Sequence, residues 1–134
     1  MRTIFVAILF VAMPWSSIAQ EVPTATPAPS REQLDHILTS RYEVIAGAMH
    51  LNDKCKVLSE PASQMLERDV VDLGAYIQRR KLVSDEILLA MQENAKQMTN
   101  ISQYADCSDA AKQAVETSAM LASMLHEDLV DKTE

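Results

Sequence analysis

The two cysteines of this chain, Cys55 and Cys107, are the first residues with the potential for chemistry. Thiol oxidoreductases usually hold two cysteines close together in sequence, beside a helix N-terminus that stabilises a thiolate. Here a long stretch of chain separates the two cysteines, and no Cys-x-x-Cys motif is present. The pattern therefore favours a structural disulfide, with two free thiols or a covalent dimer as the alternatives.

The three histidines, His36, His50 and His126, are candidates for holding a metal ion or haem. His36, Glu43 and His50 fall on one outward helical stripe, but steps of seven residues separate them by roughly 10 Å each. One ion cannot be bound across that distance, so a solvated helix face explains the stripe better. His36 and His126 would meet at one end of a helical bundle, where they could bracket a cofactor. A haem- or metal-binding bundle is thus the alternative to our expectation of no cofactor and no metal.

No residue pattern indicates catalysis. The chain has no Gly-x-Ser-x-Gly turn, and its acidic residues have the spacing of solvated faces on amphipathic helices. We expect no catalytic residues and no enzymatic activity.

Met120 and Met124 stand out because the stretch 119–125 is apolar almost all the way round a helix. If Val115, Ala122 and Leu125 face the core, both methionines point away from it. A helix that is apolar on every side is buried on every side. The stretch indicates either a partner-binding patch or homodimer seam that includes Met120 and Met124, or a helix at the centre of the fold.

The elements that must position these residues are helices, because apolar residues recur at steps of three and four from Ser30 onward. Ser30 and Gln33 form a capping-box pattern, Pro61 ends the first helical run, and Ser84 and Ser108 can cap the third and fourth helices. Gly47 falls on the polar side of the first helix. The positions expected to face inward include Leu34, Leu38, Ile45, Met65, Leu73, Ile77, Ile87, Leu88, Ile101, Ala111 and Leu125.

The predicted fold is an all-α, antiparallel up-down four-helix bundle over residues 31–131, since short connections favour antiparallel neighbours. In that topology the end of the first helix and the start of the fourth lie at the same pole. Cys55 and Cys107 occupy those two places, so we expect one disulfide between them.

The first 19 residues resemble a signal peptide, with Arg2, a short apolar run and the small residues Ser17 and Ala19 before the expected cleavage site. The apolar run is about half the length that spans a bilayer, so no stable membrane span is expected after cleavage. Residues 20–30 are rich in Pro, Thr and Ala and are expected to form a flexible tether. The predicted location is the periplasm or the outside of the cell.

Charge and composition restrict the partners. The formal net charge is −7, and removal of Arg2 with the leader, which contains no acid, makes it −8. An acidic surface repels phosphate backbones, and the expected domain has few aromatic rings on which bases could stack. Nucleic acid is therefore not expected as a partner. The expected partner is an envelope or secreted protein, or a second copy of this chain.

Two segments, GAMHLNDKC at 47–55 and DCSDAAKQA at 106–114, resemble a family of small exported bacterial helical proteins of unassigned function. The matching positions are Gly47, His50, Cys55, Cys107, Ser108 and Ala111. The resemblance implies a helical fold and an exported location, and it implies no reaction. Small acid-stress chaperones of the periplasm offer an analogy in size, helices and a single disulfide, without a shared motif. The function expected is a non-enzymatic protein-interaction module, with a chaperone-like role as one form of it.

Overall fold

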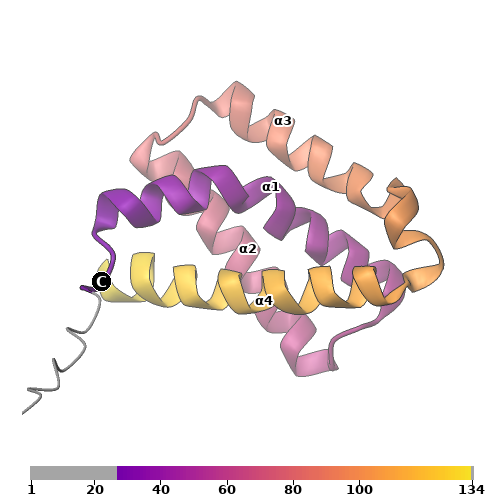
Figure 1. Ribbon diagram of the computed structural model, residues 1–134. Helices are drawn as coiled ribbons and strands as arrows, with labels where there is room; N and C mark the ends of the chain where they lie inside the picture. Colours follow the sequence, from indigo (N-terminus) through magenta and orange to yellow (C-terminus); the bar gives the residue numbers. More distant parts are fainter. Residues whose placement is uncertain (1–26, 134) are drawn as a thin grey trace, which may run out of the picture.

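The computed structural model describes residues 27–133, and all regular structure within this range is helical (Figure 1). The helices are α1 (Arg31–Cys55), α2 (Glu60–Arg80), α3 (Asp85–Lys96) and α4 (Asp109–Leu129). Three short 3₁₀ segments follow α3 or α4: η1 (Gln97–Asn100), η2 (Ser102–Cys107) and η3 (Asp131–Thr133). The predicted all-α bundle with one disulfide is confirmed. The predicted signal peptide lies outside the described residues, as does the tether up to residue 26.

Serine side chains begin three of the four α-helices, as the sequence predicts. The Ser30 hydroxyl accepts a hydrogen bond from the Gln33 amide at 3.3 Å, and the Gln33 side chain accepts one from the Ser30 amide at 2.8 Å. Ser84 and Ser108 accept from amides three residues onward in α3 and α4. Each cap satisfies a backbone donor that the first helical turn leaves without a partner.

Residues in the left-handed conformation end the first two helices. Lys56 has a φ of 50° directly after α1, and Lys81 has a φ of 52° directly after α2. The prediction that Pro61 ends the first helical run is therefore wrong in detail. Pro61 lies in the first turn of α2, where a missing backbone N–H costs nothing.

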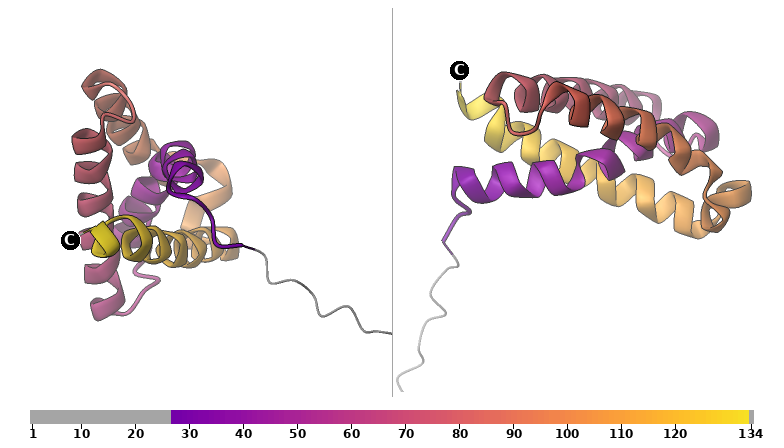
Figure 2. Two further views of the ribbon diagram at one scale, coloured as in Figure 1. Left: turned by 90° about the vertical axis from the view of Figure 1, so that its left-hand side faces the viewer. Right: turned by 90° about the horizontal axis from the view of Figure 1, so that it is seen from above.

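Helix α1 is the central element, because it packs against α2, α3 and α4 (Figure 2). Helix α4 runs back along α1 and also packs on α2, whereas α3 packs mainly on α1. In a regular square bundle α3 would lie between α2 and α4. Here α3 and α4 instead contact α1 separately, and a groove remains between them.

The apolar core lies along α1 and divides into two clusters, the smaller of which contains Leu51, Met98, Ala111 and Val115. Its fully buried large side chains are Leu38, Tyr42, Ile45, Leu51, Leu73, Ile77, Val115, Leu125 and Leu129. Three residues predicted to face inward are exposed instead: Met65 at 48%, Ile87 at 52% and Ile101 at 43%. The physical reason for Ile87 is that α3 is covered mainly on the side that meets α1, so its buried face is narrow.

Gly47 is buried, contrary to the prediction that it lies on the polar side of its helix. A Cβ atom at this position would lie 2.5 Å from Met98 Sδ and 3.2 Å from the Ala95 carbonyl oxygen. The missing side chain allows the end of α3 and the turn η1 to approach α1 closely.

Candidate functional site

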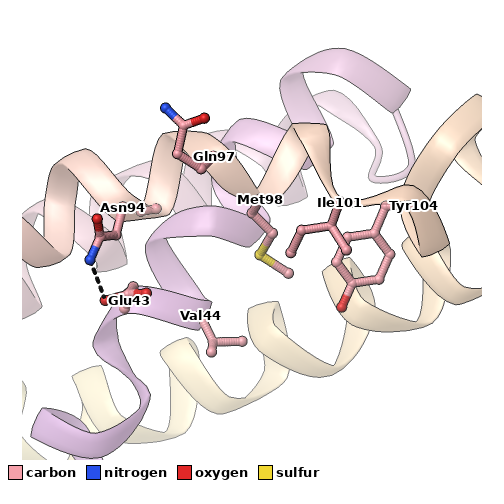
Figure 3. A pocket seen from close by; sticks show the side chains of 8 residues that line it. Glu43, Val44, Asn94, Gln97, Met98, Ile101 and Tyr104 are labelled. Carbon is pink, nitrogen blue, oxygen red and sulfur yellow. Dashed lines mark hydrogen bonds between the residues drawn. The ribbon is translucent and has the colours of Figure 1, made fainter.

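A groove between α3 and α4 is the candidate functional site, and we call it the α3–α4 groove (Figure 3). Its first hollow has a volume of about 350 Å³ and a floor formed by Glu43 and Val44 of α1. The end of α3 and the segments η1 and η2 supply the wall, with Asn94, Ala95, Gln97, Met98, Ile101 and Tyr104. Val44, Met98, Ile101 and Tyr104 converge on the hollow, so its surface is largely apolar.

The first hollow combines exposed apolar groups with a nearly neutral rim. Val44 is 45% exposed and Ile101 is 43% exposed, which is high for branched aliphatic side chains on a folded domain. Glu43 is the only charged residue in the lining of this hollow. Its carboxylate accepts a hydrogen bond from the side-chain amide of Asn94 at 3.5 Å. Such a surface suits an apolar segment whose flanking polar groups can bond to amide side chains.

A second hollow, also of about 350 Å³, extends the groove onto α4. It shares Val44 and Tyr104 with the first hollow and adds residues from η2 and α4: Gln103, Ala110, Gln113, Ala114, Thr117 and Ser118. The two hollows therefore form one concave surface that runs from α3 across α1 to α4.

Met120 and Met124 continue this surface along α4. Gln113, Thr117, Met120 and Met124 follow one another at steps of four, three and four residues, which places them on one helical face. We call these four residues the methionine stripe. Met120 is 75% exposed and Met124 is 45% exposed. Helix α1, and not α4, occupies the centre of the fold, so a central position of α4 does not explain the apolar stretch 119–125.

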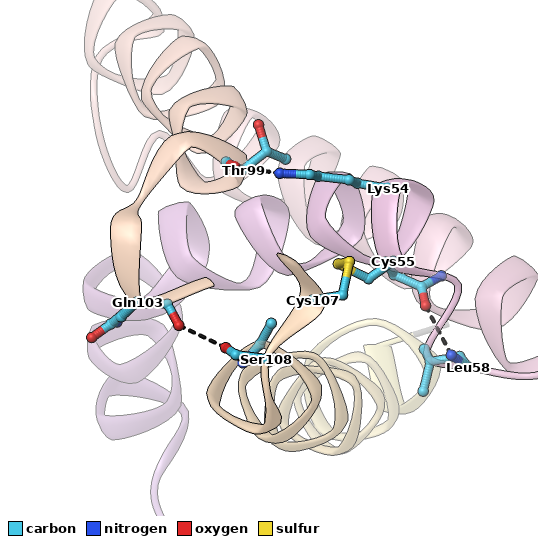
Figure 4. The surroundings of a disulfide bond; sticks show 9 residues. Lys54, Cys55, Leu58, Thr99, Gln103, Cys107 and Ser108 are labelled. Atoms are coloured by element: carbon cyan, nitrogen blue, oxygen red, sulfur yellow. Dashed lines mark hydrogen bonds between the residues drawn. A yellow bond between two sulfur atoms is a disulfide. The ribbon is translucent and has the colours of Figure 1, made fainter. Parts of the chain in front are cut away.

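The disulfide holds the end of the groove in place (Figure 4). Cys55 ends α1 and Cys107 ends η2, directly before the Ser108 cap of α4, and their Cα atoms are 5.4 Å apart. Ser108 donates a hydrogen bond to the Gln103 carbonyl at 2.6 Å, and Lys54 donates one to the Thr99 carbonyl at 3.0 Å. These links fix η1 and η2, together with Ile101 between them and Tyr104 of η2, against α1 and α4.

Two consecutive residues at the same place have unusual backbone conformations. Asp106 has a φ of 56° and Cys107 a φ of 54°, in the left-handed region that non-glycine residues seldom adopt. Each such residue costs on the order of 1 kcal/mol or more, and persists where the surroundings enforce it. The covalent bond to Cys55 is one such constraint.

Asn52 is a structural residue that the sequence analysis missed. It is 2% exposed, and its amide group donates a hydrogen bond to Ser63 Oγ at 2.8 Å. Its carbonyl oxygen accepts one from the Leu58 amide at 2.9 Å. Asn52 thereby fixes the connection from α1 to α2, next to the disulfide.

The histidines have different surroundings. His36 is exposed near the start of α1, whereas His126 is buried near the end of α4. The ring nitrogens of His126 face carboxylates: Nε2 lies 2.9 Å from Asp72, and Nδ1 lies 3.5 Å from Asp131. His126 is therefore not oriented toward a cofactor shared with His36. Within residues 27–133, no group of three or more His, Cys, Asp or Glu side chains has an arrangement that could hold a metal ion.

A buried phenol links α1 to α2 near the opposite end from the disulfide. The Tyr76 hydroxyl donates a hydrogen bond to Asp35 Oδ1 at 2.8 Å, and Arg80 lies 3.5 Å from the other oxygen of that carboxylate. Burial raises the pKa of Tyr76 above its ordinary value, and the hydrogen bond to Asp35 raises it further. This cluster stabilises the helix pair and lies away from the groove.

A separate groove lies between α2 and α3, with a volume of about 470 Å³. Tyr42 and Ala46 of α1 contribute to its lining, which also includes His50, Glu93 and Lys96. Neither Met120 nor Met124 lines this groove, so it is distinct from the candidate site.

None of the helices in the described part of the chain is both long enough and apolar enough to cross a membrane. Comparison of the chain with family models, curated proteins and solved structures found no match. The arguments about function therefore depend on the geometry above.

Proposed function

We propose that this chain is a non-enzymatic protein-interaction domain, exported to the periplasm or the cell exterior. Its contact surface is the α3–α4 groove together with the methionine stripe. The observation that carries the proposal is the exposure of Met120 and Met124 on a helical face that continues into an apolar groove. Exposed apolar surface of this kind costs solubility and is typical of sites that a partner covers.

The chemistry of the surface favours an apolar protein segment as the partner. The stripe from Gln113 to Met124 extends over about 16 Å of helix, a length that matches three turns of a partner helix. Methionine side chains are flexible and polarisable, so they adapt to partners of different shape. A chaperone-like role, in which several unfolded clients bind the same surface, is the broader form of this proposal.

Export is supported by two features of the chain. The apolar leader with small residues before position 20 is typical of a signal peptide. The Cys55–Cys107 disulfide is of a kind that persists in oxidising compartments. The resemblance to small exported helical proteins at Gly47, Cys55 and Cys107 agrees with this location.

A pair of charge substitutions tests the proposed surface. Met120→Glu with Met124→Glu places two carboxylates on the stripe without altering the core, because both side chains are exposed. The matched control is Ile87→Glu with Leu89→Glu, which changes two equally apolar residues that are 52% and 59% exposed on α3. Both variants should keep the helical content and melting temperature of the native chain.

Binding is measured by capture from an envelope fraction, followed by mass spectrometry and titration of the captured protein. We expect the methionine variant to lose about 30-fold or more in affinity, as when two central contact residues are disrupted. The control variant should bind like the native chain. Sedimentation of the purified protein identifies a second copy as the partner if the native chain is a dimer and the methionine variant a monomer. Equal binding by both variants and the native chain would refute the proposed surface.

A further inference from the structure

The charges on α4 indicate what kind of partner the methionine stripe meets. This helix contains one lysine and four carboxylates, Lys112 against Asp109, Glu116, Glu127 and Asp128. Two of the carboxylates are paired: Asp109 lies 3.4 Å from the Lys112 ammonium, and Asp128 contacts Lys132 of η3. The helix therefore has an excess of negative charge on its exposed side.

The two other carboxylates, Glu116 and Glu127, bracket the methionines. Glu116 lies four residues before Met120, and Glu127 lies three residues after Met124, so all four share the outward face of α4. Both glutamates are exposed, and neither forms an ion pair with a residue in the range 27–133. We call Glu116 and Glu127 the rim glutamates.

The α3–α4 groove beside the stripe adds to this negative charge. Glu43 lines the first hollow, and the lining of the second hollow contains no charged residue. Arg41 of α1, three residues before Val44, is exposed and offsets one carboxylate. Glu43 and the two rim glutamates against one guanidinium leave an excess of two negative charges around an apolar surface.

The shape of the groove suits a helix. Helices α3 and α4 contact α1 separately, so the groove between them is a place where one more helix can pack on α1 (Figure 1). An extended peptide would need the edge of a strand to pair with, and residues 27–133 contain no strand. An amphipathic helix can direct its apolar face toward Val44 and the methionine stripe.

We propose that the partner is a cationic amphipathic helix of another protein. Its apolar face covers the groove and the methionine stripe, and its Lys or Arg side chains meet the rim glutamates. This inference rests on the proposed function and names the chemistry of the partner. A second copy of this chain is a poorer match, because a symmetric contact would bring two acidic margins against each other.

Titration of the intact, oxidised chain with two synthetic peptides tests the charge of the partner. One peptide is an amphipathic helix with leucines along one face and lysines elsewhere, and the other has glutamates in place of the lysines. At low salt the lysine peptide should bind about tenfold or more tightly than the glutamate peptide. Added salt should reduce this difference, because it screens exposed charges. Equal affinities, or binding of neither peptide, would overturn the inference.

Substitution of the rim glutamates tests where the charge acts. Glu116→Gln with Glu127→Gln should weaken binding of the lysine peptide by about threefold or more, as expected for the loss of two exposed ion pairs. The matched control is Glu60→Gln with Glu67→Gln, which removes the same charge from exposed positions of α2, a helix that does not line the groove. An equal loss in both variants would show attraction to the net charge alone and would contradict the role of the rim.

The methionine variant separates this inference from the proposed function. Met120→Glu with Met124→Glu adds negative charge, so attraction by charge alone would strengthen binding of the lysine peptide. We expect binding to weaken by about tenfold or more, because the apolar contact is lost. Stronger binding would overturn the inference.

The natural partner provides the last comparison. If its binding depends on Met120 and Met124 but is the same at low and high salt and in the rim variant, the proposed function stands and the cationic helix is refuted. A native chain that forms a dimer through the methionine stripe would also refute it, in favour of a second copy.

Discussion

At the scale of single residues, buried polar side chains link the helices in addition to the apolar core. Asn52 fixes the connection between α1 and α2, and Tyr76 joins α2 to Asp35 of α1. Within the described residues, no buried side-chain nitrogen or oxygen lacks a hydrogen-bond partner. Since an unsatisfied buried group costs about 1–3 kcal/mol, each of these links is sensitive to substitution.

Tyr76 gives a pH-dependent prediction. Burial, and then the hydrogen bond to Asp35, raise the pKa of its phenol in the folded protein above the ordinary value of 10.0. The protonated phenol therefore stabilises the fold fully below pH 10, and this contribution is lost as the pH rises through the folded-state pKa. Urea unfolding between pH 8 and 11 should show a steeper alkaline loss of stability for the native chain than for Tyr76→Phe.

The same variant has an effect at neutral pH. Tyr76→Phe removes a hydrogen bond to a carboxylate and should lower the free energy of unfolding by about 1–2 kcal/mol. Val71→Thr is a suitable control, because it changes an exposed side chain of the same helix. An identical alkaline profile in Tyr76→Phe and the native chain would show that the phenol does not contribute.

Residue types alone could not predict these polar links. Asn52, Asp69 and His126 are polar in sequence, so helical periodicity assigns them to solvent, yet all three are buried. Their burial depends on which residues of other helices lie opposite them: Ser63 for Asn52, Asp72 for His126, and His126 for Asp69. That information is tertiary, and no spacing within one helix contains it.

At the scale of helices, the residue at which a helix begins was easier to predict than the residue at which it ends or the face that it buries. Serine caps act locally, so Ser30, Ser84 and Ser108 could be found from sequence. Helix α3 gives way to the 3₁₀ turn η1 without Gly or Pro, and Lys56 ends α1 in a left-handed conformation that favours Gly. The exposure of Ile87 follows from the packing of α3 mainly on α1, which periodicity does not reveal.

Gly47→Ala tests the close approach of α1 and α3. Alanine favours a helix over glycine by about 1 kcal/mol, so the variant would be more stable if the position were open. The added Cβ would instead lie 2.9 Å from Met98 Cβ and 3.2 Å from the Ala95 carbonyl oxygen. We expect a net loss of about 1–3 kcal/mol from overpacking, measured by chemical denaturation.

A companion variant distinguishes overpacking from other effects. Gly47→Ala combined with Met98→Ala removes Met98 Sδ, which would lie 2.5 Å from the new Cβ, and leaves Met98 Cβ in place, so it should recover part of the loss relative to Met98→Ala alone. A more stable Gly47→Ala protein would show that α3 does not pack closely on α1 at this point.

At the scale of the whole molecule, one covalent bond joins parts of the fold that are far apart in sequence. Cys55 and Cys107 are separated by 52 positions, and their bond closes a loop that contains α2 and α3. The sequence was sufficient to predict the pairing, because the up-down order expected for four helices with short connections would place both cysteines at one pole. It was not sufficient to predict that α1 is central, since that depends on how α3 and α4 divide the surface of α1.

Removing the disulfide should destabilise the whole domain. In the chain-entropy model, closing a loop of this length stabilises the fold by about 4 kcal/mol. We expect Cys55→Ala with Cys107→Ala to unfold at a lower urea concentration by a corresponding amount, with the difference absent when both proteins are compared under reducing conditions. Equal stability of the oxidised native chain and the double variant would contradict this role.

The central claim is that the α3–α4 groove and the methionine stripe form the surface that meets a partner. Site-specific photocrosslinking in living cells tests it most directly, with the crosslinker placed at Met120 in one protein and at Leu89 in another. Both positions are exposed, at 75% and 59%, and they lie on different helices. The account predicts that the crosslinker at position 120 captures one discrete protein or a second copy of this chain. It predicts no crosslinked product from position 89. Crosslinks of equal yield to the same partner from both positions, or from position 89 alone, would contradict it.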